Sequence, residues 1–96
     1  MTTFSHIEKD SPAHNRVYWH SRRGMLELDM LLMPFAKKHF PSLNAEDQQR
    51  YMSLLKEEDQ DLFLWLMQRS APDETELQHS IAQILAYAQS TTHVQD

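Results

Sequence analysis

A single glycine, Gly24, occurs among the 96 residues of this chain, and this scarcity restricts the folds available to it. Tight hairpin turns need residues that accept positive φ, which glycine does at the least steric cost. Valine and isoleucine, which favour strands, occur at only two and three positions. Leucine, methionine, glutamine, glutamate and alanine dominate, and these residues favour helix. We therefore predict an all-α protein, a small single-domain bundle of about five short helices.

Charge and composition exclude several classes of function. A net charge of −5 argues against a nucleic-acid-binding module, which usually carries a basic face. The chain has no cysteine, so disulfides, thiol catalysis and cysteine-based metal sites are excluded. The N-terminus lacks the basic and apolar regions of a secretory signal, and the apolar stretch 25–36 is interrupted by acids and too short to span a bilayer. We expect a cytoplasmic protein that does not insert into membranes.

Start and stop signals divide the chain into helical segments between two flexible tails. We predict an N-terminal tail at residues 1–10, a helical domain at 11–90 and a C-terminal tail at 91–96. Proposed helix starts lie at Ser11–Pro12, near Gly24, at Asn44, at Asp59 and at the Asp73/Glu76 pair. The five segments that begin there are expected to span about 11–22, 24–40, 45–57, 59–70 and 73–90. Within the second segment, Pro34 predicts a kink.

Apolar residues at helical spacing indicate which faces form the core. The second helix should be the central one of the bundle, because apolar residues cover more than half of its circumference. The predicted core comprises Leu28, Leu31, Leu32, Phe35, Ala36, His39, Tyr51, Leu54, Leu55, Leu62, Phe63, Trp65, Leu66, Met67, Leu77, Ile81, Ile84, Leu85 and Ala88.

Catalytic and metal-binding motifs are missing from the sequence. None of the six histidines has the spacing of a helical metal motif, and a chain with one glycine has no glycine-rich phosphate loop. The serines lack the glycines of a nucleophile elbow. The acidic run 57–61 lacks the ligand spacing of a calcium loop and is interpreted as a helix junction. We predict that the chain is not an enzyme and binds no metal. Met25, Met30 and Met33 are open to two interpretations, an adaptable docking surface or core filler.

The segment Arg23-Gly24-x-x-Glu27 also has two interpretations. It can be a glycine helix cap followed by an exposed ion pair worth a few tenths of a kcal/mol. Alternatively, glycine between opposite charges can form a contact surface where another backbone approaches closely. Arg16 and Trp19 lie at helical steps before Arg23, so we expect the three to share a face.

The segment from Arg23 to Asp29, with Arg16 and Trp19 before it and Met33-Pro34-Phe35 after it, resembles the SdhE family. The match continues through Asp61-Leu62-Phe63-x-Trp65-Leu66-Met67 and covers most of residues 14–88. Arg-Gly-x-x-Glu alone is a weak pattern, but the three motifs at these spacings are specific together.

The resemblance implies a five-helix fold and a chaperone that promotes covalent attachment of FAD to the flavoprotein subunit of succinate dehydrogenase and of the related fumarate reductase. In such a protein FAD is the cofactor of the client, and the chain itself binds none stably. Carried over by position, the contact with the flavoprotein comprises Arg23, Gly24 and Glu27, with Arg16, Met25 and Asp29 as neighbours that take part. We expect the chain to act as a monomer.

Two other functions remain open at this point. Some relatives have been described as antitoxin-like proteins or cytoskeletal regulators, a role that would not need the Arg-Gly-x-x-Glu face. Direct carriage of FAD is the other, although the sequence offers no nucleotide-binding motif.

Overall fold

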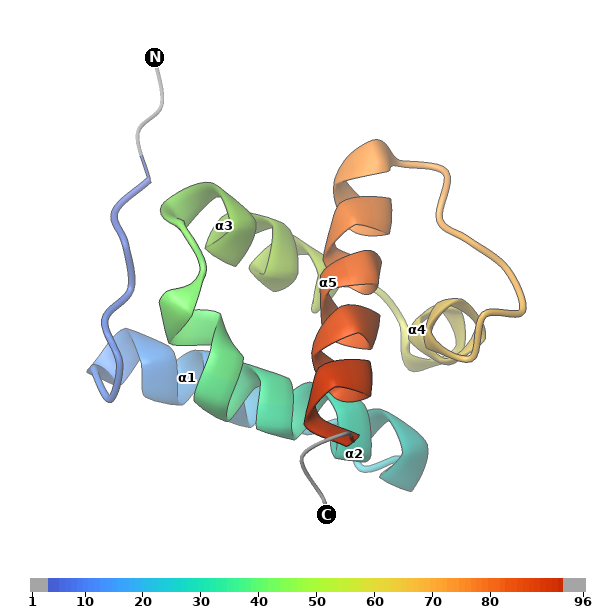
Figure 1. Cartoon of the computed structure of the whole chain (residues 1–96), viewed down its shortest axis with the longest axis horizontal. Helices are drawn as coiled ribbons and strands as arrows, with labels where there is room; N and C mark the ends of the chain where they lie inside the picture. The colour runs from blue at the N-terminus through green and yellow to red at the C-terminus, as the bar shows by residue number, and fades with distance from the viewer. Residues whose placement is uncertain (1–3, 93–96) are drawn as a thin grey trace.

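Five α-helices make up most of the chain in the computed structural model, which describes residues 4–92. They are α1 (Pro12–His20), α2 (Leu26–Pro34), α3 (Ala45–Leu54), α4 (Asp59–Leu66) and α5 (Thr75–Thr92) (Figure 1). No strand occurs within residues 4–92. The prediction of a small all-α bundle of five helices is therefore confirmed.

Two helix starts follow directly from their capping residues. The Ser11 hydroxyl accepts a hydrogen bond from the His14 amide at 3.1 Å, and Pro12 occupies the first helical position of α1. The Asn44 side chain accepts from the Asp47 amide at 2.8 Å at the start of α3. Both were predicted, because a cap depends only on residues within one turn.

Other helix starts differ from the prediction. The second helix begins at Leu26 and not near Gly24, because Gly24 has φ +83°, a left-handed conformation that a right-handed helix cannot contain. Glu58, not Asp59, is the N-cap of α4. The carbonyl of Glu74 accepts the first helical hydrogen bond of α5, from Gln78, so the cap position is Glu74, one residue after the predicted Asp73, and the helix starts at Thr75.

Helix α4 ends at Leu66 and not near Ser70 because of a backbone reversal at Gln68. Gln68 has φ +61°, and its amide donates to the carbonyl of Trp65 at 3.1 Å while the Arg69 amide donates to Leu64 at 2.8 Å. This pair of bonds is the Schellman arrangement that terminates helices, usually with glycine at the left-handed position. Helix α3 likewise ends at Leu54, before the predicted end at residue 57.

Pro34 changes the helix geometry, as predicted. Proline has no amide hydrogen, so the regular α2 ladder ends there and a wider π-helical turn, Phe35–His39, follows. A 3₁₀ turn, Phe40–Ser42, then completes the segment. The chain thus continues in one direction to Ser42 while Phe35, Ala36 and Phe40 remain buried.

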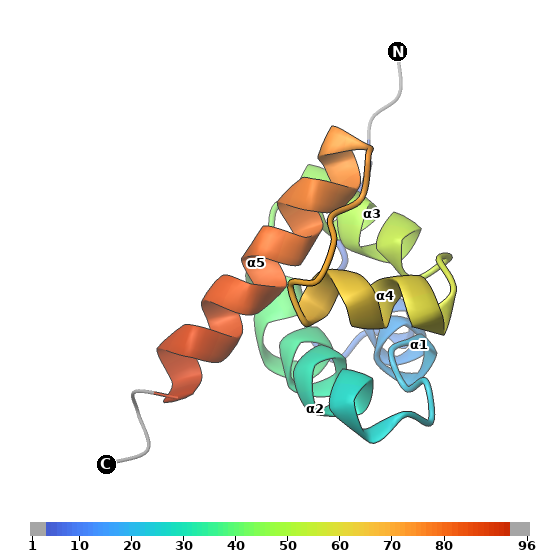
Figure 2. The ribbon, with the colours of Figure 1, turned by 90° about the vertical axis from the view of Figure 1, so that its right-hand side faces the viewer.

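The core lies between α2 with its π-helical extension and the helices α3, α4 and α5. Figure 2 shows α5 crossing the other helices and projecting beyond them at its C-terminal end. Most of the predicted core is buried, although Leu31, His39, Phe63, Trp65, Met67, Leu85 and Ala88 are only half-buried. Val17, Phe40 and Leu43 are also buried and were not predicted: Val17 lies on α1, Phe40 is the last residue of the predicted second segment, and Leu43 lies in the gap between the second and third segments.

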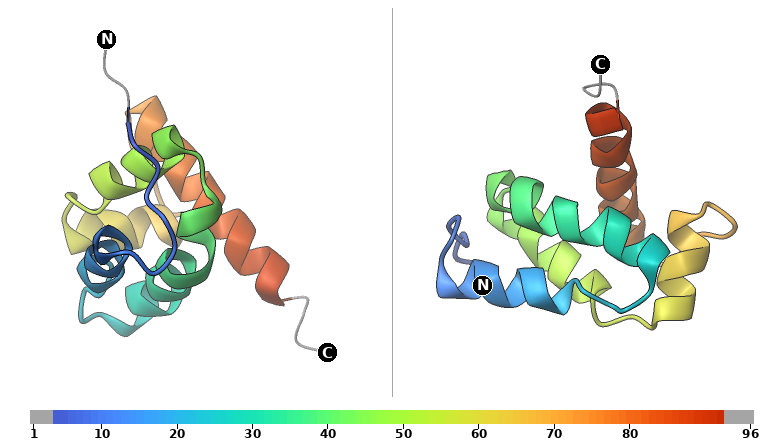
Figure 3. Two further views of the ribbon diagram at one scale, coloured as in Figure 1. Left: turned by 90° about the vertical axis from the view of Figure 1, so that its left-hand side faces the viewer. Right: turned by 90° about the horizontal axis from the view of Figure 1, so that it is seen from below.

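The described part of the N-terminal segment lies against α3. The Ile7 amide donates to the Gln48 side-chain oxygen at 2.8 Å, and the Gln48 side-chain nitrogen donates back to the Ile7 carbonyl at 3.0 Å. Figure 3 shows this segment running along the helices. The expected C-terminal tail overlaps the last two residues of α5, and residues 93–96 lie outside the described part of the chain. Within residues 4–92, no helix is long and apolar enough to cross a bilayer.

Candidate functional site

Gly24 lies in the open loop between α1 and α2. The residue is exposed, has φ +83°, and a Cβ built on it would meet no atom within 4 Å. It does not cap α1, because Ser21 occupies the C-cap position. Glycine is therefore required here by backbone conformation and not by crowding within the molecule. The space beside it is accessible from outside.

Arg16 and Glu27 flank this loop as exposed charges. Among residues 4–92 neither side chain makes a hydrogen bond or ion pair. The ion pair between Arg23 and Glu27 that the structural interpretation required is not formed, because Arg23 pairs with Asp59 at 2.8 Å. The carboxylate of Glu27, three residues after Gly24, is thus available to a partner, whereas the guanidinium of Arg16 belongs to a residue four positions before the end of α1 that lines a hollow with Ile7 and Met52.

The Arg23 side chain turns into the molecule. Its Nη1 donates to the carbonyls of His20 at 3.2 Å and Leu55 at 2.9 Å, and its Nη2 donates to the carbonyl of Glu57 at 2.9 Å. Arg16 and Trp19 are exposed on α1, whereas the Arg23 side chain is only 13% exposed. The expected common face is therefore wrong, because α1 ends before Arg23.

Asp29 and Met25 shape the loop from the α2 side. The Asp29 carboxylate accepts a hydrogen bond from the backbone amide of Arg23 at 2.7 Å, and it lies in the first turn of α2, where the helix dipole favours an acid. Met25 is half-buried and occupies the N-cap position without a side-chain cap. Both residues hold the loop and have limited exposed surface.

Exposed apolar side chains lie next to the charged loop. Leu26 and Met30, one turn apart on α2, are 70% and 66% exposed, and Trp19 on α1 is 59% exposed. The sequence left the role of the methionines open, and the structure separates them, since Met30 is exposed while Met25 and Met33 are half-buried. Leu26 was missed as a surface residue; its spacing from Met30, out of step with the buried Leu28 and Leu32, is the signal that identifies it.

The buried polar groups beneath the site are neutral and paired. A hydrogen bond of 2.7 Å joins the hydroxyls of Ser21 and Tyr51. Burial raises the pKa of Tyr51, with the Ser21 bond and the Arg23 charge opposing this effect. A neutral tyrosine here stabilises the end of α1 and offers no acid or base to the surface.

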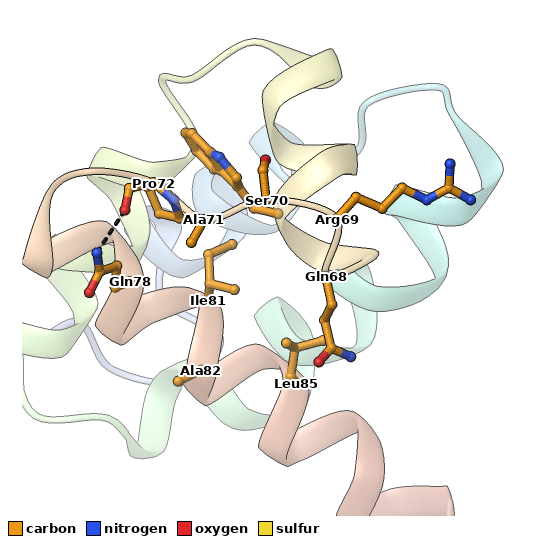
Figure 4. A pocket seen from close by; sticks show the side chains of 10 residues that line it. Gln68, Arg69, Ser70, Ala71, Pro72, Gln78, Ile81, Ala82 and Leu85 are labelled. Carbon is orange, nitrogen blue, oxygen red and sulfur yellow. Dashed lines mark hydrogen bonds between the residues drawn. The ribbon is translucent and has the colours of Figure 1, made fainter.

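A groove with a volume of about 480 Å³ lies elsewhere, between the α4–α5 connection and α5. Figure 4 shows Ile81, Ala82 and Leu85 along its floor, and Arg69 extending away from it. Gln78 closes one end by donating to the carbonyl of Pro72 at 2.7 Å. Its lining offers no pair of acid and base, and within residues 4–92 no cluster of histidine and carboxylate side chains fits a metal ion.

Comparison with known proteins matches this chain to one family. The model for Sdh5, described as the flavinator of succinate dehydrogenase, matches residues 15–88. The chain belongs to this family. The matched span includes the α1–α2 loop, α4 and nearly all of α5, so it covers every residue of the candidate site.

Individual relatives agree with the family match. A Pseudomonas aeruginosa protein named FAD assembly factor SdhE is 53% identical over 76 residues, which cover 79% of this chain and 90% of that protein. A Pectobacterium atrosepticum protein of the same name is 41% identical over 70 residues, 73% of this chain and 80% of that protein. The solution structure of a UPF0350 protein superposes with a TM-score of 0.68 at 34% identity and covers 86% of this chain and 89% of that one.

Proposed function

We propose that this chain is an assembly factor that promotes covalent FAD attachment to the flavoprotein subunit of succinate dehydrogenase. The related fumarate reductase flavoprotein is a second client. The proposal is supported by the family description and by the relatives named FAD assembly factor SdhE. The chain acts in the cytoplasm as a monomer and holds no cofactor of its own.

The observation that carries the docking part of this proposal is the open surface at Gly24. A backbone without a side chain is exposed there, three residues before the unpaired carboxylate of Glu27, and the unpaired guanidinium of Arg16 is exposed on α1. Exposed apolar contacts from Leu26 and Met30 continue the surface along α2. Charged groups around an apolar patch are typical of a protein-docking surface.

The chain acts by positioning its client and not by supplying a catalytic group. Covalent flavinylation requires a histidine of the flavoprotein to be held against the 8α-methyl group of the flavin. Holding reacting groups in the right geometry can contribute several kcal/mol to a rate. Docking at Gly24, with Glu27 accepting hydrogen bonds and Arg16 meeting a carboxylate or phosphate, would fix the immature subunit so that its own residues react.

The variant Gly24→Arg tests this docking. A bulky side chain at an exposed loop should leave the helical content nearly unchanged, while covalent FAD on the flavoprotein subunit in cells is lost. Gly24→Ala is the matched control: it carries the same φ strain of about 1 kcal/mol but adds only a methyl group, so it should retain most flavinylation. Helical content comes from circular dichroism, and covalent FAD from in-gel flavin fluorescence of the denatured subunit.

Two results would contradict the proposal. One is unfolding of Gly24→Arg, which would make the glycine a structural requirement only. The other is unchanged covalent FAD with this variant or without the gene, which would favour a regulatory interaction protein of the antitoxin-like or cytoskeletal kind.

A further inference from the structure

The Arg23 guanidinium lies where three helices meet. It bonds the carbonyl of His20 at the end of α1, the carbonyls of Leu55 and Glu57 beyond the end of α3, and the carboxylate of Asp59 at the start of α4. Helix ends leave carbonyls without intrahelical partners, and a cation is favoured there. Figure 2 shows the α1–α2 loop beside the start of α4, and Figure 3 (right) shows it next to the α3–α4 connection.

Few donors remain on Arg23 for a partner protein. An arginine has five N–H donors. Nε uses its one N–H on Asp59, Nη1 makes two bonds and Nη2 makes one. A single Nη2 donor is left on a side chain that is 13% exposed, so a two-point contact with an external carboxylate would require internal bonds to break. Arg16 and the exposed Arg22 carry no such commitments within the described residues.

The backbone of Arg23 is fixed as firmly as its side chain. Its amide donates to Asp29 at 2.7 Å, which ties residue 23 to α2. Residue 23 is thus joined to α2 through its backbone and to α1, α3 and α4 through its side chain. Gly24 follows immediately with a left-handed φ, so the direction in which the chain leaves Arg23 decides where Gly24 and Glu27 are presented.

We propose that Arg23 is a positioning residue: its guanidinium fastens the α1–α2 loop to the ends of α1, α3 and α4 and so holds Gly24 and Glu27 in the docking conformation. It does not contact the flavoprotein as a docking charge. The cation that meets the client is supplied by Arg16 or Arg22. This inference rests on the proposed docking function and assigns a different task to the first residue of the Arg-Gly-x-x-Glu segment.

The variants Arg23→Lys and Asp59→Asn distinguish the two roles. Lysine keeps the charge but cannot reproduce the planar fork that reaches three carbonyls and a carboxylate together. We expect Arg23→Lys to bind the purified apo flavoprotein subunit about tenfold more weakly, a difference of about 1.4 kcal/mol. Asp59→Asn, which alters the carboxylate partner of Arg23, should weaken binding in the same direction, and the double variant should be no weaker than Arg23→Lys alone.

Matched variants separate positioning from loss of overall stability. Asn44→Ala removes the α3 cap and destabilises the fold at a distance from the loop, so at a temperature where it remains folded its affinity should equal that of the wild type. Arg69→Lys, which changes an exposed arginine on the α4–α5 connection outside the docking surface, should also bind normally. The backbone amide of residue 23, which donates to Asp29, should exchange its hydrogen faster in Arg23→Lys than in the wild type, whereas Asn44→Ala should leave this exchange rate unchanged.

The outcomes distinguish this inference from the function on which it rests. Wild-type affinity for Arg23→Lys, together with loss of binding for Gly24→Arg, would overturn the positioning role and leave the docking function intact. Additive losses in the Arg23/Asp59 cycle would also overturn it, because they would indicate two independent contacts with the client. Normal binding by Gly24→Arg would overturn the docking function itself.

Discussion

Two clusters of charged side chains link different parts of this small bundle, and they differ in the groups that they connect. In the first, Arg23 donates mainly to backbone carbonyls at helix ends and forms a single ion pair, with Asp59. In the second, Asp47 on α3 accepts hydrogen bonds from Arg50 at 2.6 Å and from Gln83 at 3.0 Å, and its carboxylate lies 3.2 Å from Nε2 of His79, an ion pair when that imidazole is protonated. Arg50 also pairs with Glu76.

The second cluster joins two regular helices side chain to side chain, whereas the first fixes a loop. The axes of α3 and α5 are already held together by buried residues such as Tyr51, Leu54, Ile81 and Ile84, so the Asp47 cluster adds to an existing contact. The α1–α2 loop packs against the core only through the half-buried Met25, and polar bonds from Arg23 fix the residue just before Gly24. Charges therefore adjust stability in one region and determine the shape of a surface in the other.

The largest expected effect on stability is that of Arg23→Ala. It removes an ion pair and three carbonyl contacts from a largely buried side chain, so the free energy of unfolding should fall by about 2 kcal/mol. Urea titration followed by circular dichroism measures this difference. Arg22→Ala, next to it and exposed, should change stability by less than about 0.5 kcal/mol. If Arg23→Ala and Arg22→Ala were equally stable, the bonds of Arg23 to the helix ends would contribute nothing to stability, and the proposed difference between the two clusters would be wrong.

The contrast also explains which parts of the molecule could be predicted from sequence. The caps at Ser11 and Asn44 depend on residues within one turn, and both predictions are confirmed. The predicted core stripes of the second and fifth helices are confirmed in part, because four of their members, Leu31, His39, Leu85 and Ala88, are only half-buried. The partner of Arg23 lies 36 residues away at Asp59, so sequence spacing offered only the nearby Glu27.

The predicted end of α4 was also wrong, and the reason lies in the local backbone. The reversal at Gln68 uses a residue that seldom adopts positive φ, so no glycine marked the end of α4. The docking residues remain a prediction from the motif, and the structure shows that Gly24, Glu27 and Arg16 are exposed. The exposed apolar residues Leu26 and Met30 became apparent only when the buried face of α2 was known.

A smaller effect is expected from Asp47→Asn, and it should depend on pH. Burial alone would raise the pKa of the Asp47 carboxyl. Hydrogen bonds from Gln83 and Arg50 and the charges of His79 and Arg50 together lower this pKa by a larger amount, so the net pKa lies below the usual value. A carboxyl with a lowered pKa stabilises the folded state above its ordinary pKa, and this stabilisation is lost as the pH falls through the folded value.

The wild type should therefore exceed Asp47→Asn by about 1 kcal/mol at neutral pH. The difference should shrink as the pH falls below about 4, where the unfolded carboxyl is protonated. Urea titrations of both proteins at several pH values measure it. Arg23→Ala, whose bonds go mainly to carbonyls, should show a loss that changes less over this range. A constant difference for Asp47→Asn would contradict the ionic character of the second cluster.

The smallest effect is expected from Glu76→Gln at the edge of the same cluster. The Glu76 side chain is 65% exposed, so its pairing with Arg50 competes with water and mobile ions, and exposed pairs of this kind contribute little to stability. The melting temperature should differ from the wild type by no more than the error of calorimetry, and any difference should disappear at about 1 M salt, where screening acts within about 3 Å. A loss as large as that of Asp47→Asn would show that Glu76 is needed to orient Arg50 toward Asp47, and the outer half of the cluster would then resemble the Arg23 junction, where one side chain holds the geometry of several elements.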